Sequence, residues 1–175
     1  SNQPAFATLM DKLANMVIDY LTAIYEAGAD AVQLFDTWAG IMPEHEFKEF
    51  NLPVLKKIFS GLKAKGITAT YYAKNSHHLL DSLKHTGAAV ISLDWRTPLS
   101  EARDIFGSNI AIQGNLDPTA LLGSEDRIRS ETRRVIAEAG DKGGFVFNLG
   151  HGILPMTPIS SVEILLDEIR GGGSH

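Results

Sequence analysis

The chain has 175 residues, of which 44% are hydrophobic, enough for one buried core in one domain. Its net charge of −5 creates no field that favours phosphate backbones or anionic lipid, so neither nucleic acid nor a membrane is an expected partner. The absence of cysteine excludes disulfides, thiolate nucleophiles and zinc–thiolate sites, and the absence of a signal peptide or of an apolar run of about 18 residues favours a cytoplasmic location.

The first predicted element is an amphipathic helix from Pro4 to Ala27, because apolar residues recur there at every third or fourth position. Gly28 follows at the position where a glycine commonly ends a helix. The next segment, residues 31–37, is a short apolar run that ends in polar residues and is too short for a helix. It is predicted to be a buried strand.

Helices and strands then alternate along the rest of the chain. Further strands are predicted at residues 69–73, 89–93, 110–113 and 145–149, with Gly114-Asn115 ending the third of these. The helices expected between and after them cover about 44–65, 77–85, 97–106, two segments beginning at Asp117 and Ser124, and 157–169. Thr97-Pro98 is interpreted as an N-cap and first-turn pair, and Thr157-Pro158 as the start of the last helix.

This order of elements predicts an α/β fold with parallel strands, because a helix between two strands is the crossover that parallel pairing needs. No glycine-rich nucleotide-binding motif follows any predicted strand. Polar residues follow every strand instead, as in (β/α)8 barrels, whose sites lie at the carboxyl ends of the strands. Because such a barrel takes about 250 residues, residues 1–170 are predicted to be the C-terminal part, about five βα units, of a longer (β/α)8 TIM-type barrel. Residues 171–175 are predicted to be a flexible tail or a cloning remnant.

Four stretches at the predicted strand ends carry a resemblance to a known family. They are GADAVQLFDTWAG at 28–40, LDWRTP at 93–98, IQGNLDP at 112–118 and FNLGHGI at 147–153. In order and spacing they resemble the C-terminal half of the uroporphyrinogen decarboxylase family. Four matches in register along the chain are far more specific than one short motif.

The resemblance implies a distorted (β/α)8 barrel, usually a homodimer, that removes carbon dioxide from the acetate side chains of uroporphyrinogen to give coproporphyrinogen without a cofactor. It implies substrate contacts for Thr37 and His151, with His151 as a catalytic residue, and it places Phe35 against the macrocycle. The family's arginine-rich segment, central aspartate and substrate-binding tyrosine precede the matched region. The chain is therefore expected to carry only part of the active site.

His151 also stands out from residue chemistry. Decarboxylating a pyrrole acetate requires proton delivery to the ring and then to the new methyl carbon, together with anchoring of several carboxylates. A histidine titrates near neutral pH and suits either task, and the flanking Gly150 and Gly152 allow close approach of the backbone to a ligand. The alternative is a histidine that only caps a strand end by hydrogen bonding.

Thr37 and the aspartates at strand ends have structural alternatives as well. Thr37 could donate a hydrogen bond to a substrate carboxylate, although a turn or N-cap hydroxyl is the commoner role for a threonine after a strand. Asp36 and Asp94 would repel an acid-rich substrate. They are therefore expected to be held by backbone amides, by Arg96 or by Arg103.

The remaining polar candidates are interpreted mainly as structural. His77 and His78 would point about 100° apart on a helix and could not chelate a metal together, so no metal site is expected. Lys74 could attract a substrate carboxylate or lie along the surface. Side chains expected to pack under loops or to tie loops to strands are Trp38, Trp95, Gln113, Asn115 and Asn148.

Two other functions remain open. Cobamide-dependent methyltransferases resemble these decarboxylases, but their zinc is held by thiolate and histidine, and this chain has no cysteine. The second is an inactive fragment that serves as a folding or interaction module. The isolated chain is expected to bind tetrapyrrole weakly, without turnover, and to form a homo-oligomer through exposed strand edges and an uncovered apolar interior.

Overall fold

Five parallel strands form one sheet that follows the order of the sequence, β1-β2-β3-β4-β5. The computed structural model describes residues 3–141 and 143–171, so most of the predicted tail, 172–175, lies outside the described residues. The strands are β1 (Val32–Asp36), β2 (Ala69–Ala73), β3 (Val90–Leu93), β4 (Ala111–Leu116) and β5 (Phe145–Leu149). Every predicted strand is therefore present.

Helical segments precede and follow each strand. They are α1 (Gln3–Glu26), η1 (Ala39–Ile41), α2 (Glu44–Glu46), η2 (Phe47–Asn51), α3 (Leu52–Ala64), η3 (His77–Leu79), α4 (Leu80–Leu83), α5 (Leu99–Phe106), η4 (Pro118–Leu122), α6 (Glu125–Ala139) and α7 (Ile159–Ile169). The predicted helix at 44–65 is one continuous run of α2, η2 and α3, with a π-helical turn near its start. Ser124 caps α6 and Asp117 caps η4 through side-chain oxygens, which satisfy N–H groups that a helix start leaves free.

Thr97 is not the N-cap that was predicted, and the helix predicted to start at Thr157-Pro158 likewise begins without a threonine cap. Pro98 and Pro158 occupy the N-cap positions of α5 and α7, and no side-chain cap is formed. The hydroxyls of Thr97 and Thr157 are buried one residue earlier, without a hydrogen-bond partner in the described part of the chain. The pattern located both helices correctly but misplaced the start by one residue.

Strand β4 continues through Gly114-Asn115 to Leu116, so the predicted break is wrong. Gly114 has a φ of 136°, and a Cβ at this position would lie 2.7 Å from the carbonyl oxygen of Leu93 on β3. Glycine is needed here because the two backbones approach closely, and it does not end the strand.

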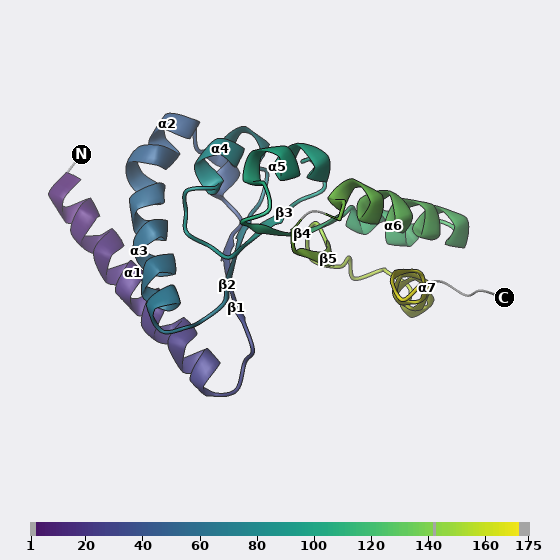
Figure 1. The fold of residues 1–175 in the computed structure, drawn as a ribbon, viewed down its shortest axis with the longest axis horizontal. Coiled ribbons are helices and arrows are strands. Elements are labelled where there is room, and N and C mark those ends of the chain that lie inside the picture. Colours follow the sequence, from purple (N-terminus) through teal and green to yellow (C-terminus); the bar gives the residue numbers. More distant parts are fainter. Residues whose placement is uncertain (1–2, 142, 172–175) are drawn as a thin grey trace.

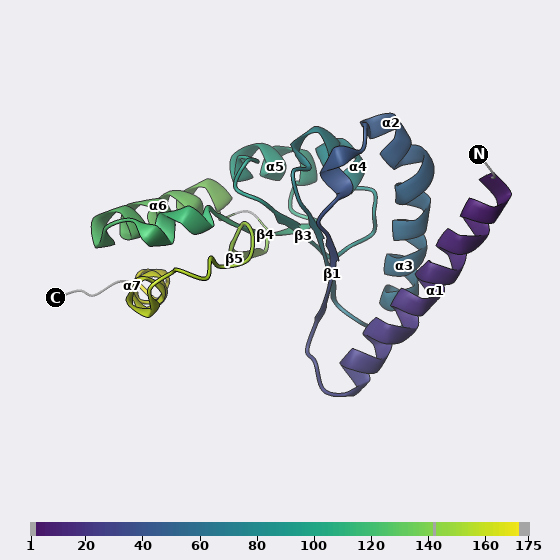
Figure 2. The same ribbon diagram turned by 180° about the vertical axis from the view of Figure 1, so that it is seen from behind.

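The helices lie on one side of the sheet, where they form an arc with α1 outside α3 at one end and α7 beside α6 at the other (Figures 1 and 2). The core fills the space between this arc and the strands, and Ile91, Leu93 and Ile112 are completely buried in it. Phe59 of α3 packs against the Tyr71 ring of β2 with ring centroids 5.8 Å apart. Sequential parallel strands with helices on one side form the arrangement of five consecutive units of a (β/α)8 barrel.

Two contacts between strands that are not neighbours show that the sheet is strongly curved. Adjacent strands lie about 4.8 Å apart, so three strand steps span about 14 Å in a flat sheet. The side-chain amide of Gln113 on β4 nevertheless donates to Oε1 of Gln33 on β1 at 3.0 Å. Tyr72 on β2 similarly reaches Gly150, which directly follows β5.

The centre of the concave face is polar, contrary to the expected apolar interior. Gln113 also donates to Ser92 on β3, and both side chains are almost completely buried, as is Thr70 on β2. The alternation of the strands placed their apolar residues toward the helices, which left amides and hydroxyls on the opposite face. Because they bond one another, the curved sheet buries them at little cost.

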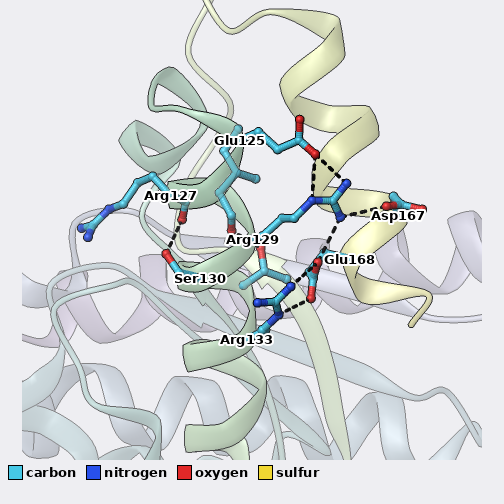
Figure 3. Close-up of polar contacts among 9 residues, drawn as sticks. Glu125, Arg127, Arg129, Ser130, Arg133, Asp167 and Glu168 are labelled. Carbon is cyan, nitrogen blue, oxygen red and sulfur yellow. Dashed lines mark hydrogen bonds and ion pairs between the residues drawn. The ribbon is translucent and has the colours of Figure 1, made fainter. Parts of the chain in front are cut away.

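Ion pairs join α6 to α7 at the C-terminal end of the arc (Figure 3). Arg129 of α6 donates to Glu125 of its own helix and to Asp167 and Glu168 of α7, while Arg133 donates to both oxygens of Glu168.

None of the helices in the described ranges is long and apolar enough to cross a bilayer.

Candidate functional site

Phe35, Tyr72 and His151 form a row of rings at the carboxyl ends of the strands. Phe35 of β1 and Tyr72 of β2 are partners in the sheet register, and their ring centroids lie 5.6 Å apart. The imidazole of His151, two residues after β5, stacks on Tyr72 at 6.0 Å with an angle of 14° between the rings. Phe35 is 67% exposed and His151 is exposed, whereas Tyr72 between them is buried.

Tyr72 connects the row to the backbone after β5. Its hydroxyl lies 2.9 Å from the carbonyl oxygen of Gly150 and 3.0 Å from Nδ1 of His151. Burial, together with the nearby charge of Asp94, raises the pKa of Tyr72 to about 12, so the hydroxyl remains protonated at neutral pH.

Gly150 is fixed between two strand ends. Its N–H donates to the carbonyl oxygen of Leu116 at 2.7 Å. A Cβ at Gly150 would lie 2.6 Å from the backbone nitrogen of Trp95 and 3.1 Å from the backbone carbon of Asp94, so any larger residue would displace the chain. The backbone that carries His151 therefore has little freedom to move.

Thr37 follows the end of β1, on the same rim of the sheet as His151, because all five strands run in parallel. Its side chain is half-buried. Among the described residues its hydroxyl caps no helix and makes no other hydrogen bond, which leaves it able to donate to a ligand. No hydrogen bond joins Thr37 to His151 directly.

The two aspartates at strand ends are held by the protein, as predicted. Asp36 accepts a hydrogen bond from the hydroxyl of Tyr71 at 2.9 Å and one from the backbone N–H of Trp38 at 3.3 Å. Burial, together with the Asp36 carboxylate, raises the pKa of Tyr71.

Asp94 is 1% exposed and accepts from the backbone N–H groups of Asn75 and Arg96, and from the Arg96 guanidinium at 3.2 Å. The proposed role of Arg103 is wrong. Its guanidinium donates to three backbone carbonyls, at Gly107, Ile110 and Gly144, because it lies near the amino ends of β4 and β5.

The remaining candidates are mostly structural. Asn115 is buried and donates to the carbonyl oxygens of Asp94 and Thr97, so it ties a loop to a strand as expected. Trp95 lies beneath the Arg96 guanidinium, whose carbon is 4.3 Å from the ring centroid. Trp38 is 72% exposed, so its expected packing under a loop is wrong.

The other polar side chains form separate contacts and no shared cluster among the described residues. Asn148 is exposed and accepts from the N–H of Leu149. His77 and His78 are exposed at the start of η3, where they contact Glu101 and the Met42 carbonyl separately. The described residues contain no group of three or more acidic, histidine or cysteine side chains placed to bind a metal.

The structure thus brings two sequence-predicted residues, Phe35 and His151, together through Tyr72, to which the sequence analysis gave no role. A signal for it was present. Tyr71 and Tyr72 are adjacent in a strand, so one of them has to face away from the helices. Its contact with His151 depends on the curvature of the sheet, which no local pattern encodes.

A curved parallel sheet with candidate ligand contacts at its carboxyl rim defines a domain of the (β/α)8 barrel class. The family model described as "Uroporphyrinogen decarboxylase (URO-D)" matches residues 1–171, and the chain belongs to this family.

Curated relatives agree with this assignment. The chain is 44% identical over 153 residues to the uroporphyrinogen decarboxylase of Geotalea daltonii, with 87% of this chain and 45% of the relative covered. It is 43% identical over 162 residues to that of Syntrophotalea carbinolica, with 93% and 47% covered. The chain spans about half the length of the curated relatives that it matches.

A solved structure supports the fold alone. A methyltransferase from Methanosarcina mazei superposes with a TM-score of 0.80 at 23% identity, covering 96% of this chain and 53% of that one.

Proposed function

We propose that this chain forms part of the substrate site of a uroporphyrinogen decarboxylase, which converts the acetate side chains of uroporphyrinogen to methyl groups. Membership in the family supports this proposal, and so does the row formed by Phe35, Tyr72 and His151. The exposed Phe35 ring and the exposed imidazole of His151, on either side of Tyr72, suit a macrocycle that is apolar on its faces and acidic at its periphery. The activity belongs to the whole protein, of which this chain supplies one part.

The chemistry assigns a task to each residue. Protonation of a pyrrole ring lets the ring take up the electron pair released when the bond to the carboxylate carbon breaks and carbon dioxide leaves. A proton then joins the exocyclic carbon, and the ring loses its extra proton, so that no cofactor is consumed. In this scheme Phe35 packs against the macrocycle, the Thr37 hydroxyl donates to a carboxylate, and His151 anchors a carboxylate or transfers a proton.

The hydrogen bonds to Asp36 and Asp94 make the rim compatible with an acid-rich substrate. Asp94 accepts hydrogen bonds from two backbone N–H groups and from the Arg96 side chain, and Asp36 accepts them from Tyr71 and Trp38. Donors directed at these carboxylates offset part of their charge. The rim can therefore accept further carboxylates with less repulsion than its sequence suggests.

Titration of the chain with uroporphyrin tests the binding role of His151. Quenching of porphyrin fluorescence should show weak binding, and His151→Ala should raise the dissociation constant at least about tenfold, because a hydrogen bond to a charged group contributes about 1.5–3 kcal/mol. His85→Ala is the matched control, since His85 is exposed and follows α4 on the way to the amino end of β3. Unchanged binding in His151→Ala would mean that His151 has no role in recognition.

Turnover of uroporphyrinogen tests whether this chain is active by itself. We expect the isolated chain to release no carbon dioxide from uroporphyrinogen, because the family's N-terminal site residues lie outside the matched motifs. Release by this chain alone would refute both that expectation and the module alternative. The methyltransferase alternative requires a cysteine thiolate that binds zinc, and this chain has no cysteine. We also propose that the protein forms a homodimer and is located in the cytoplasm.

A further inference from the structure

The hydroxyl of Tyr72 has one proton and two neighbours, Gly150 and His151. The Gly150 carbonyl oxygen, 2.9 Å away, can only accept a hydrogen bond, whereas Nδ1 of His151, 3.0 Å away, can donate or accept. Gly150 is buried, and among the described residues Tyr72 is the donor found for its carbonyl. If Tyr72 donated to Nδ1 instead, this carbonyl would lose its donor, at a cost of about 1–3 kcal/mol.

The Tyr72 hydroxyl therefore donates its proton to the Gly150 carbonyl oxygen. The contact with His151 is then a hydrogen bond only when Nδ1 carries a proton and donates it to the tyrosine oxygen. In the neutral ring the other nitrogen, Nε2, then holds a lone pair. Nε2 has no hydrogen-bond partner in the described part of the chain, and the side chain is exposed.

We propose that Tyr72 is a positioning residue that holds His151 as the Nδ1–H tautomer and directs Nε2 toward the open rim of the sheet. The assignment of Nε2 as the atom that meets a substrate carboxylate rests on the proposed function, whereas the tautomer itself does not. Neutral Nε2 accepts a proton, and protonated Nε2–H donates to a carboxylate. The same ring position thus serves anchoring and proton transfer.

Packing around Tyr72 makes this orientation rigid. Its ring is held between Phe35 and the nearly parallel imidazole, and it is only 3% exposed. The raised pKa keeps the hydroxyl protonated and therefore able to serve Gly150 across the physiological range. The Gly150 backbone is fixed in turn by Leu116 and by its contact with Trp95.

Histidine side-chain nitrogens report the tautomer directly in a long-range ¹H–¹⁵N correlation spectrum. The spectrum is recorded at about pH 8.5, roughly two units above the ordinary histidine pKa, so that neutral rings dominate. The chain has six histidines, and comparison with His151→Ala identifies the signal of His151. We expect this signal to show a protonated Nδ1 in the wild type and to move toward Nε2–H in Tyr72→Phe.

Tyr71→Phe is the matched control. It removes an equally buried hydroxyl from the neighbouring position, but that hydroxyl faces Asp36 and not His151. Its His151 signal should remain that of the wild type. A wild-type Nε2–H tautomer overturns the proposal, as does an unchanged tautomer in folded Tyr72→Phe. Should Tyr72→Phe fail to fold, the wild-type spectrum alone decides.

Uroporphyrin titration distinguishes this inference from the proposed function. Tyr72→Phe should weaken binding about threefold, and in the His151→Ala background it should have no further effect, because Tyr72 acts through His151. Additive losses would overturn the positioning role. If no variant changes uroporphyrin binding while the tautomer is as expected, the proposed function fails and the tautomer assignment stands.

Discussion

At the scale of single residues, Asp94 holds the strand-end loops in place. Its carboxylate accepts from Asn75 in the segment after β2 and from Arg96 in the segment after β3. Its own carbonyl accepts from Asn115 on β4. Three strand ends therefore meet at one buried charge, directly beside the Gly150 backbone that carries His151.

Asp94→Asn should destabilise the fold by about 2–4 kcal/mol, because it places an amide group against donors that need an acceptor. Urea unfolding at neutral pH measures the change as a lower midpoint with the same slope. Asp104→Asn is the control, since Asp104 is exposed on α5 and makes no polar contact with the described residues. An unchanged midpoint in Asp94→Asn would contradict the structural role given to Asp94.

The candidate site was predictable to the extent that its residues follow strands. Phe35, Thr37 and His151 all stand at strand ends, and parallel strands bring such residues to one rim. Tyr72 was missed because its function comes from a contact 79 residues away, formed only when the sheet curves. Arg103 was misassigned for a different reason, because its acceptors are backbone carbonyls, which sequence patterns do not reveal.

At the scale of elements, α6 and α7 are joined by charge as well as by apolar packing (Figure 3). The Glu168 side chain is 8% exposed and accepts from both Arg133 and Arg129. Hydrogen bonds from Arg133 and then Arg129 lower the pKa of Glu168, and the carboxylates raise that of Arg129. The contact fixes the last helix against the rest of the arc.

The lowered pKa of Glu168 predicts a defined pH dependence of stability. A carboxyl whose folded pKa is depressed stabilises the protein above its ordinary pKa of about 4.3, and this contribution is lost as the pH falls through the folded pKa. Glu168→Gln should therefore unfold at lower urea than the wild type at pH 7, and the difference should shrink as the pH falls below about 4.

Glu163→Gln on the same helix is the control, because Glu163 is exposed and forms no ion pair among the described residues. Its midpoint should follow that of the wild type at each pH. If the difference in urea midpoint between Glu168→Gln and the wild type increased as the pH fell, the predicted sign of the pH dependence would be wrong.

Element bounds were predicted well where one local signal dominated. Apolar spacing located α1, and short runs that follow glycine and end in polar residues or glycine located β2 and β5. The errors arose where a residue type has two uses. Gly114 resembles a strand breaker but is required by the close approach of β3, and Thr97 resembles a cap although its hydroxyl is buried.

At the scale of the whole molecule, apolar surface remains open on the outer side of α1. Phe6, Leu9, Leu13, Met16 and Tyr20 are each at least 39% exposed and lie at helical spacing. The edge strands β1 and β5 add backbone groups that can pair with another chain. Contiguous apolar surface of this kind is typical of a face that binds protein.

We expect the chain to self-associate at micromolar concentration, with a mass above that of the monomer by multi-angle light scattering. Leu9→Lys combined with Met16→Lys should lower the apparent mass, because two charges interrupt the α1 stripe. Leu122→Lys, at a single exposed leucine on η4, should not. A wild-type chain that scatters as a monomer would refute the prediction.

The class of fold could be predicted because alternating helices and strands permit few topologies. The polar concave face could not, since it results from side chains of β1, β3 and β4 that meet only after the sheet curves.

The bridge between Gln33 and Gln113 has a mechanical consequence. Because it spans two intervening strands, flattening the sheet would break it and leave the Gln33 side-chain oxygen without this donor. The curvature of the sheet is therefore stabilised by side chains of the protein itself, and a ligand that binds at the rim has to fit the opening that this curvature sets.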